Sequence, residues 1–196
     1  MPGVPGPVLF LGRDDSLALA HLRDVERDVV ALAPEEPITP ELLDRLDPAF
    51  AVSHGYKLII RSATLARLPD RVINLHISFL PYNRGVQPAL WSVLEGTPSG
   101  VTIHYVDEGL DTGDLIAQEP LELPDDWTFS EAYDRLQEAI AGLFTRVWPA
   151  IRDGTAPRHP QPPGGTLHRY ADYDAVAHLL PQGWDTRVGA VRAGVR

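Results

Sequence analysis

The sequence predicts an α/β fold with parallel strands, because largely apolar runs alternate with helical segments near its start. The runs Val8–Leu11, Asp28–Ala33 and Ala49–Ser53 have the composition of strands that are buried on both faces. The order strand, helix, strand, helix, strand implies parallel βαβ units with helices covering the sheet. Such a sheet binds its ligands at the carboxyl ends of the strands, so functional residues are expected there.

The two intervening helices have recognisable starts. Asp14 or Asp15 can cap the first helix, and Thr39, followed by proline and glutamate, starts a second helix that runs through Leu46. The first strand-to-helix turn, LFLGRDDS, holds a single glycine and lacks the G-x-G-x-x-G pattern. We therefore expect no dinucleotide cofactor.

Length and composition indicate one domain, or one domain with a tail. The chain has 196 residues, no cysteine and a net charge of −10 from 17 basic and 27 acidic residues. The acidic balance disfavours nucleic acid as a partner, and the missing cysteines exclude disulfides and thiolate chemistry. No apolar run is long enough for a membrane span, and the start has no signal-peptide pattern, so we expect a cytoplasmic protein.

The middle of the chain carries the residues suited to chemistry. In the expected strand 72–76, Asn74 and His76 lie two positions apart and face the same way. A loop with proline and glycine follows, then a helical segment around 89–94 that stops at Gly96. A second strand, 100–106, leads into the acidic loop 107–114, which contains Asp111.

From the residues alone, two interpretations of this stretch stay open. Asn74, His76 and Asp111 form a joint site, or they are a polar pair on an exposed strand and a solvated loop carboxylate. His104 is either a substrate contact or a core histidine with its hydrogen bonds satisfied. A calcium loop is rejected because Thr112 stands where an EF-hand requires glycine, so no metal is expected.

The segment after the third strand, HGYKLII, also allows two interpretations. Tyr56, Leu58 and Ile60 alternate, which favours core residues, although the same residues could line an apolar ligand slot.

The last part of the chain predicts a helix and then an arm. Thr128 and Glu131 form a capping-box pattern, and the amphipathic helix that follows is expected to stop at Pro149. Proline and glycine are concentrated just beyond Gly154. We therefore divide the chain into a catalytic domain, 1–153, and a C-terminal arm, 154–196, that docks on the body, pairs two chains in a homodimer, or does both.

The motifs INLHISFLPYNRG and GVTIHYVDEGLDTGD resemble those of the 10-formyltetrahydrofolate-dependent formyltransferase family. The family shares an N-x-H strand, an S-x-L-P loop that ends in glycine, a G-V-T-x-H strand and a D-x-G loop, in this order. The resemblance implies a Rossmann-like formyltransferase fold, with a mostly parallel central sheet and helices on both faces, followed here by the Pro/Gly-rich C-terminal arm. These sequence motifs are most similar to those of small sugar N-formyltransferases.

The resemblance also implies roles for individual residues. It makes Asn74, His76 and Asp111 the catalytic residues, and beside them we take His104 as a substrate contact. Four further residues would bind the formyl donor, 10-formyltetrahydrofolate: Tyr56, Leu58, Ile60 and Asp107. The implied reaction moves the formyl group to a primary amine of a small molecule, such as a nucleotide-linked amino sugar. The alternatives are a 10-formyltetrahydrofolate hydrolase and a non-catalytic binding module.

Formyl transfer passes through a tetrahedral oxyanion, and Asn74 and His76 can donate N–H groups to it. A carboxylate near His76 favours the imidazolium form of the ring. The expectation from sequence is therefore a protonated His76, with activity rising with pH until that proton is lost.

Overall fold

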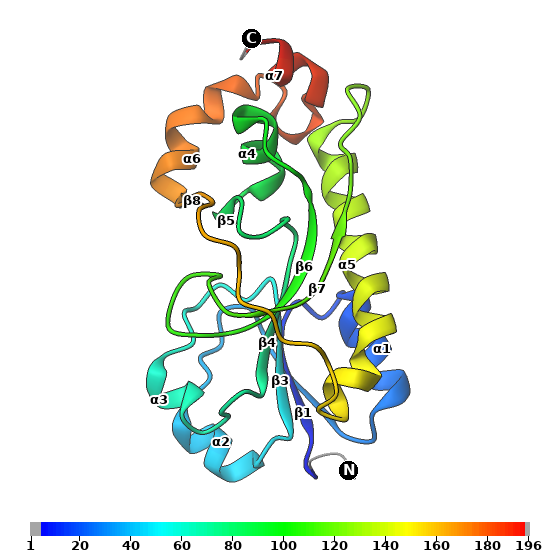
Figure 1. Cartoon of the computed structure of the whole chain (residues 1–196), viewed down its shortest axis with the longest axis vertical. Coiled ribbons are helices and arrows are strands. Elements are labelled where there is room, and N and C mark those ends of the chain that lie inside the picture. The colour runs from blue at the N-terminus through cyan, green and yellow to red at the C-terminus, as the bar shows by residue number, and fades with distance from the viewer. Residues whose placement is uncertain (1–4, 195–196) are drawn as a thin grey trace.

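The computed structural model describes residues 5–194, which form a six-stranded sheet in the order β2-β1-β3-β4-β6-β7 with helices on both faces (Figure 1). The strands of this sheet are β1 (Val8–Gly12), β2 (Val29–Leu32), β3 (Phe50–His54), β4 (Val72–His76), β6 (Gly100–Tyr105) and β7 (Leu115–Pro120). A second, two-stranded sheet pairs β5 (Arg84–Gly85) with β8 (Leu167–His168). The main helices are α1 (Leu17–Val25), α2 (Pro40–Leu46), α3 (Ser62–Leu65), α4 (Pro88–Glu95) and α5 (Phe129–Arg152).

The central sheet changes direction at β4. The strands β2, β1, β3 and β4 pair in parallel, whereas β6 and β7 add to β4 in antiparallel order. The prediction of a mostly parallel sheet is therefore confirmed. Strand β7 was not predicted, because the two polar residues of its sequence LIAQEP are adjacent and the strand lies at the sheet edge, where the alternation signal is weak.

Two apolar layers cover the sheet, one on each face. Along β1, Val8 and Phe10 pack in one layer, with α1 and α5, while Leu9 and Leu11 pack in the other, with α2 and α3. All five residues of β1 are buried, as expected of a central strand in a parallel sheet. The layer with α5 is the larger and extends over β4 and β6.

Helix α5 begins as the sequence predicts but does not end as predicted. Thr128 accepts a hydrogen bond from the Glu131 N–H and the Glu131 carboxylate accepts one from the Thr128 N–H, so the capping box is confirmed. The predicted stop at Pro149 is wrong, because the helix continues to Arg152. Trp148 and Ile151 are buried on either side of the proline, and this burial stabilises the last turn.

The start of helix α1 is also a correction. Ser16, and neither Asp14 nor Asp15, is the residue before the first turn, and its side chain makes no capping bond. Asp15 instead pairs with Arg13. The hydroxyl of Ser16 lies 2.9 Å from Nδ1 of His54, at the carboxyl end of β3.

The buried His54 predicts acid sensitivity. Burial lowers the pKa of His54 from 6.5 to about 4, so the folded protein binds this proton less readily than the unfolded chain. The group's contribution to the free energy of unfolding is therefore complete above about pH 6.5 and is lost as the pH falls toward about 4. We expect the free energy of unfolding of His54→Gln, measured in urea, to fall by about 2 kcal/mol less than that of wild type when the pH is lowered from about 7 to about 5. His178→Gln, at an exposed site, should show the same dependence of unfolding free energy on pH as wild type. The wild-type dependence in His54→Gln would contradict the prediction.

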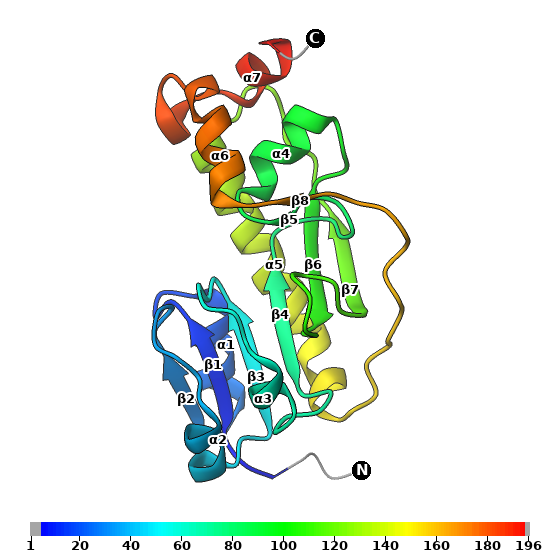
Figure 2. The same ribbon diagram turned by 90° about the vertical axis from the view of Figure 1, so that its left-hand side faces the viewer.

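The C-terminal segment returns along the body of the molecule. After α5 it runs without regular structure past the edge of β7 and then forms β8 beside β5 (Figure 2). Two further helices, α6 (Tyr170–Val176) and α7 (Val188–Gly194), lie at the same end as α4 (Figure 2). The segment thus docks on its own chain, while its separation as a domain and its part in a homodimer stay predictions. Within residues 5–194, no helix has the length and apolar character to span a bilayer.

Candidate active site

Strand β4 turns two polar side chains away from the larger apolar layer. Ile73 and Leu75 pack in that layer with α5, so Asn74 and His76 face the opposite side of the sheet. Strand β6 pairs with β4 so that Asn74 lies opposite His104. Antiparallel pairing puts directly opposed side chains on one face, and the three polar groups therefore converge.

The loop after β6 brings Asp111 to the same place. The Asp107 carboxylate accepts hydrogen bonds from the Gly109 N–H (3.0 Å) and the Thr112 hydroxyl (2.7 Å), which closes the loop on itself. Asp111 has a left-handed backbone, with φ of 53°, which Asp tolerates better than most residues. This conformation points its carboxylate toward β4 and β5.

The Asp111 carboxylate accepts hydrogen bonds on both oxygens. Oδ2 accepts the backbone N–H of Gly85 at 2.9 Å, and Oδ1 accepts the Asn74 amide at 3.3 Å. His76 Nε2 lies 3.7 Å from Oδ2, and His104 Nε2 lies 3.6 Å from Oδ1. The structure therefore brings together the three predicted catalytic residues and the predicted substrate contact in one buried cluster.

The ring of His104 has a defined tautomer in its neutral form. Its Nδ1 lies 2.7 Å from the carbonyl oxygen of Tyr105, which can only accept, so Nδ1 carries the proton. Nε2 is then free to accept a hydrogen bond from the amide nitrogen of Asn74, 3.3 Å away. His104 thus orients Asn74 while it also lies against Asp111.

The charges of the cluster follow from burial and from these contacts. Burial lowers the pKa of His76, and the Asp111 carboxylate only partly opposes this. Burial alone would raise the pKa of Asp111. The positive charge that His76 gains in acid, together with contacts to His104 and to the Gly85 N–H, outweighs burial, so that pKa lies well below its usual range. At neutral pH the pair is a carboxylate beside a neutral imidazole.

Comparison with known proteins settles the family. The model of the formyl transferase family matches residues 23–147, which is more than half of the chain. The chain belongs to the formyl transferase family. The family prediction made from the motifs is confirmed.

Two groups of relatives surround this formyl transferase chain. The crystal structure of the formyltransferase PseJ from Anoxybacillus kamchatkensis, in complex with UDP-4,6-dideoxy-4-formamido-L-AltNAc and tetrahydrofolate, is 38% identical. It covers 97% of this chain and 100% of its own, with a TM-score of 0.89. Methionyl-tRNA formyltransferase of Syntrophus aciditrophicus is 38% identical over 65% of this chain and 41% of its own length. Methionyl-tRNA formyltransferase of Acetivibrio thermocellus is 31% identical over 83% of this chain and 52% of its own length. The chain thus spans about half, or less, of these tRNA-directed relatives.

The expected imidazolium at His76 is corrected by the structure. Ion pairing with Asp111 favours the proton, but removing the ring from water disfavours it more strongly. The ring makes a hydrogen bond with the backbone of Asn83, while its Nε2 is buried without a hydrogen-bond partner among the described residues. A neutral ring with an unpartnered nitrogen is suited to accept a proton.

The residues predicted to bind the donor differ in exposure and in their contacts within the protein. The Tyr56 hydroxyl donates to the Glu36 carbonyl (2.7 Å) and accepts from the Ile38 N–H (3.0 Å). Ile60 is buried in the layer with α2 and α3, whereas Leu58 is 39% exposed. The fourth of them, Asp107, is taken up by its own loop, as described above. Leu58 therefore keeps the best case for a ligand contact, and donor binding by all four stays a prediction.

Two contributions to the site were missed from sequence. The N–H of Gly85 holds Asp111, but a backbone group leaves no side-chain signal in a sequence. Gln161 donates to the Asp111 carbonyl at 2.9 Å, from the C-terminal arm, to which no site residue was assigned. Nothing in the local pattern around Gln161 indicated this contact.

Other features of the described residues are weaker candidates for an active site than this cluster. Two surface hollows of about 460 and 530 Å³ lie around Thr97 and Arg192, away from Asp111. We favour the buried cluster because it combines convergent polar groups with shifted pKa values. Within residues 5–194, no group of three or more His, Asp or Glu side chains is placed to hold a metal ion.

Proposed function

We propose that the protein is an N-formyltransferase that moves the formyl group of 10-formyltetrahydrofolate to a primary amine of a small molecule. The observation that carries the proposal is the convergence of Asn74, His76, His104 and Asp111 in a buried cluster of a formyl transferase chain. An amide donor, a neutral imidazole and an ionised carboxylate are the groups that acyl transfer to an amine requires.

The reaction balances with these groups and needs no covalent enzyme intermediate. The amine nitrogen attacks the formyl carbon, and the carbonyl oxygen becomes an oxyanion. Collapse of this intermediate reforms the carbonyl and breaks the bond to the folate nitrogen N10. One proton leaves the amine and one reaches N10, so the products are a formamide and tetrahydrofolate.

We assign proton transfer to His76. Its neutral Nε2 accepts the proton of the attacking amine and returns it to N10. The Asp111 carboxylate, 3.7 Å away, stabilises the imidazolium that forms in between. The Asn74 amide can give one of its two N–H groups to the oxyanion, because its bonds to Asp111 and His104 are long, at 3.3 Å each.

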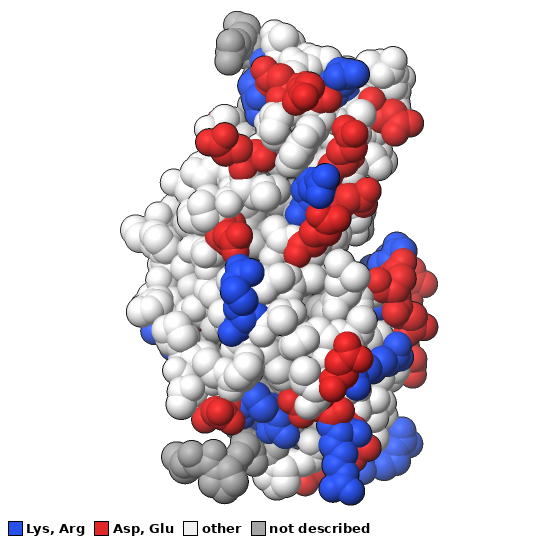
Figure 3. All heavy atoms as spheres, turned by 90° about the vertical axis from the view of Figure 1, so that its right-hand side faces the viewer, with Lys and Arg blue, Asp and Glu red and all other residues white. Residues whose placement is uncertain are grey.

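For the acceptor we propose a nucleotide-linked amino sugar. The PseJ structure, which matches nearly the whole of this chain, contains a UDP-linked formamido sugar. A tRNA acceptor fits less well, because the net charge is −10 and a polyanion needs a basic surface. On the face shown in Figure 3, acidic side chains lie between the basic ones and no continuous basic band crosses it.

A transfer assay tests the proposal. We expect purified protein with 10-formyltetrahydrofolate and UDP-linked 4-amino sugars to release tetrahydrofolate and a formamido sugar in equal amounts. Formate release without any amine would instead support a hydrolase. Transfer to methionyl-tRNA in preference to every amino sugar would overturn the acceptor, and no turnover of the donor under any condition would support a binding module.

Donor binding yields a separate prediction. Leu58 lies in the loop after β3, at the carboxyl ends of the parallel strands, and exposes part of its apolar side chain. We expect Leu58→Arg to weaken binding of 5-formyltetrahydrofolate at least about tenfold in calorimetric titration, since a charge would replace apolar contact area.

The matched control for this substitution is Val25→Arg. Val25 is 53% exposed at the C-terminal end of α1. Because α1 connects two parallel strands, this end of the helix lies near the amino ends of the strands, away from their carboxyl ends. Equal binding by Leu58→Arg and wild type would remove Leu58 from the donor site.

A further inference from the structure

We propose that Gln161, in the C-terminal arm, is a positioning residue that holds the Asp111 loop in its reactive geometry. The inference rests on the proposed function, because it assigns part of that same site to the arm. Gln161 does not touch Asn74 or His76 in any described contact, so it acts through the backbone that carries Asp111.

The side-chain amide of Gln161 bonds two segments through both of its N–H groups and its oxygen. Its Nε2 donates to the carbonyl oxygens of Asp111 (2.9 Å) and Gly113 (2.8 Å). Its Oε1 accepts a hydrogen bond from the Arg84 guanidinium at 2.9 Å. An amide has two N–H groups and one oxygen, and all three are engaged here.

These two segments are the ones that place the Asp111 carboxylate. Arg84 directly precedes Gly85, whose N–H binds Oδ2 of Asp111. Gln161 therefore joins strand β5, which donates this hydrogen bond, to the loop that carries Asp111. The left-handed backbone of Asp111 is uncommon for residues other than glycine, even though Asp tolerates it better than most, and surrounding contacts help to hold it. The two carbonyl bonds from Gln161 are such contacts.

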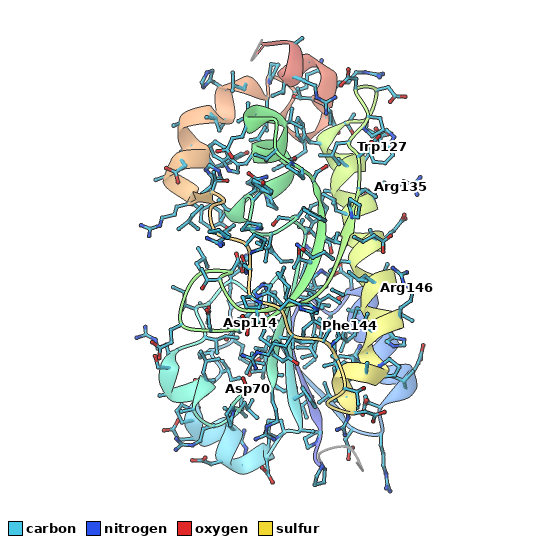
Figure 4. The ribbon with its side chains drawn as sticks, in the orientation of Figure 1. Asp70, Asp114, Trp127, Arg135, Phe144 and Arg146 are labelled. Carbon is cyan, nitrogen blue, oxygen red and sulfur yellow. The ribbon has the colours of Figure 1, made fainter. Side chains whose placement is uncertain are left out.

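The arm around Gln161 is itself anchored on one side by Arg158 and His159. His159 exchanges two backbone hydrogen bonds with Leu115, at 2.7 and 3.0 Å. Arg158 pairs with both Asp114 and Asp70, which Figure 4 labels on neighbouring parts of the fold. These contacts fix the arm directly beside the loop that carries Asp111.

On its other side the arm is anchored by Gly165 and Thr166. Gly165 lies so close to Pro81 that a Cβ there would come within 2.0 Å of the proline carbonyl oxygen. The Thr166 hydroxyl accepts the N–H of Asn83 at 3.1 Å. With fixed backbone on both sides, the amide of Gln161 has little freedom to leave the Asp111 loop.

Kinetics of two variants test the proposal. In Gln161→Ala all three bonds are lost, and in the isosteric Gln161→Glu the two N–H donors are replaced by an acceptor that faces carbonyl oxygens. We expect both to lower kcat by about 10- to 100-fold, because small displacements of a reacting group cost this much. KM for the folate donor and the Tm should change little, and Gln182→Glu, at an exposed site, should behave as wild type.

A spectroscopic measurement separates this inference from the proposed function. If the Asp111 carboxylate withdraws in Gln161→Ala, it no longer supports the His76 imidazolium, and the pKa of His76 measured by NMR titration should fall. An unchanged kcat, a loss of kcat that follows a loss of Tm, or an unchanged His76 titration would overturn the positioning role. If wild type transfers no formyl group, the proposed function fails, and the NMR titration still decides whether Gln161 positions Asp111.

Discussion

Replacing His76 with alanine is expected to lower kcat for formyl transfer by about 100- to 10,000-fold, the range for loss of a general base. His76 Nε2 is buried without a hydrogen-bond partner among the described residues, and we assign proton transfer to it. His104 Nε2 lies against the other oxygen of Asp111 and faces the Asn74 amide. The measurement is steady-state release of tetrahydrofolate at saturating donor and amine.

The matched control for this prediction is His178→Ala, because His178 is exposed in the C-terminal segment. It should keep wild-type kcat and Tm. His76→Ala should also remain folded, since the Nε2 that it removes has no hydrogen-bond partner among the described residues and no bond at that atom is lost. Turnover of His76→Ala within a few fold of wild type would rule out its role as base.

The second large effect is expected for Asp111→Asn, with a loss of kcat of about 100- to 1,000-fold. The substitution keeps the shape of the side chain but removes the charge that stabilises the His76 imidazolium. The pKa of His76 should fall further, because the carboxylate is the main group that raises it. Glu108→Gln, which neutralises an exposed carboxylate of the same loop, should leave kcat and the His76 titration unchanged.

Asp111→Asn should also change how stability depends on pH. The pKa of Asp111 in the folded protein lies below its value in the unfolded chain, which is about 3.9. Its contribution to the free energy of unfolding is therefore complete above that unfolded value and is lost as the pH falls toward the folded one. Wild type should be the more stable protein at neutral pH, and the difference should shrink in acid. If the difference in unfolding free energy between wild type and Asp111→Asn stays constant from neutral to acid pH, the assigned charge of Asp111 is contradicted.

Part of the site could be predicted because strand periodicity is a local property. The spacing of Asn74 and His76 puts both on one face whatever else the chain does, and the apolar residues between them show which face is buried. For the same reason the capping box at Thr128 and the glycine stop at Gly96 were predictable, since each involves residues within one turn. The end of α5 was not, because burial of Trp148 and Ile151 outweighs the local effect of Pro149.

By itself, the sequence determined the α/β class, the strand that carries Asn74 and His76, and the family. The tertiary structure decided that His104 and Asp111 meet those two side chains, that His76 is neutral, and that Gln161 reaches the Asp111 loop. Each of these depends on segments far apart in the chain. Gln161 lies 50 positions beyond Asp111, and burial of the cluster requires the whole sheet. Local patterns specify faces and turns, whereas register, burial and charge state follow from long-range packing.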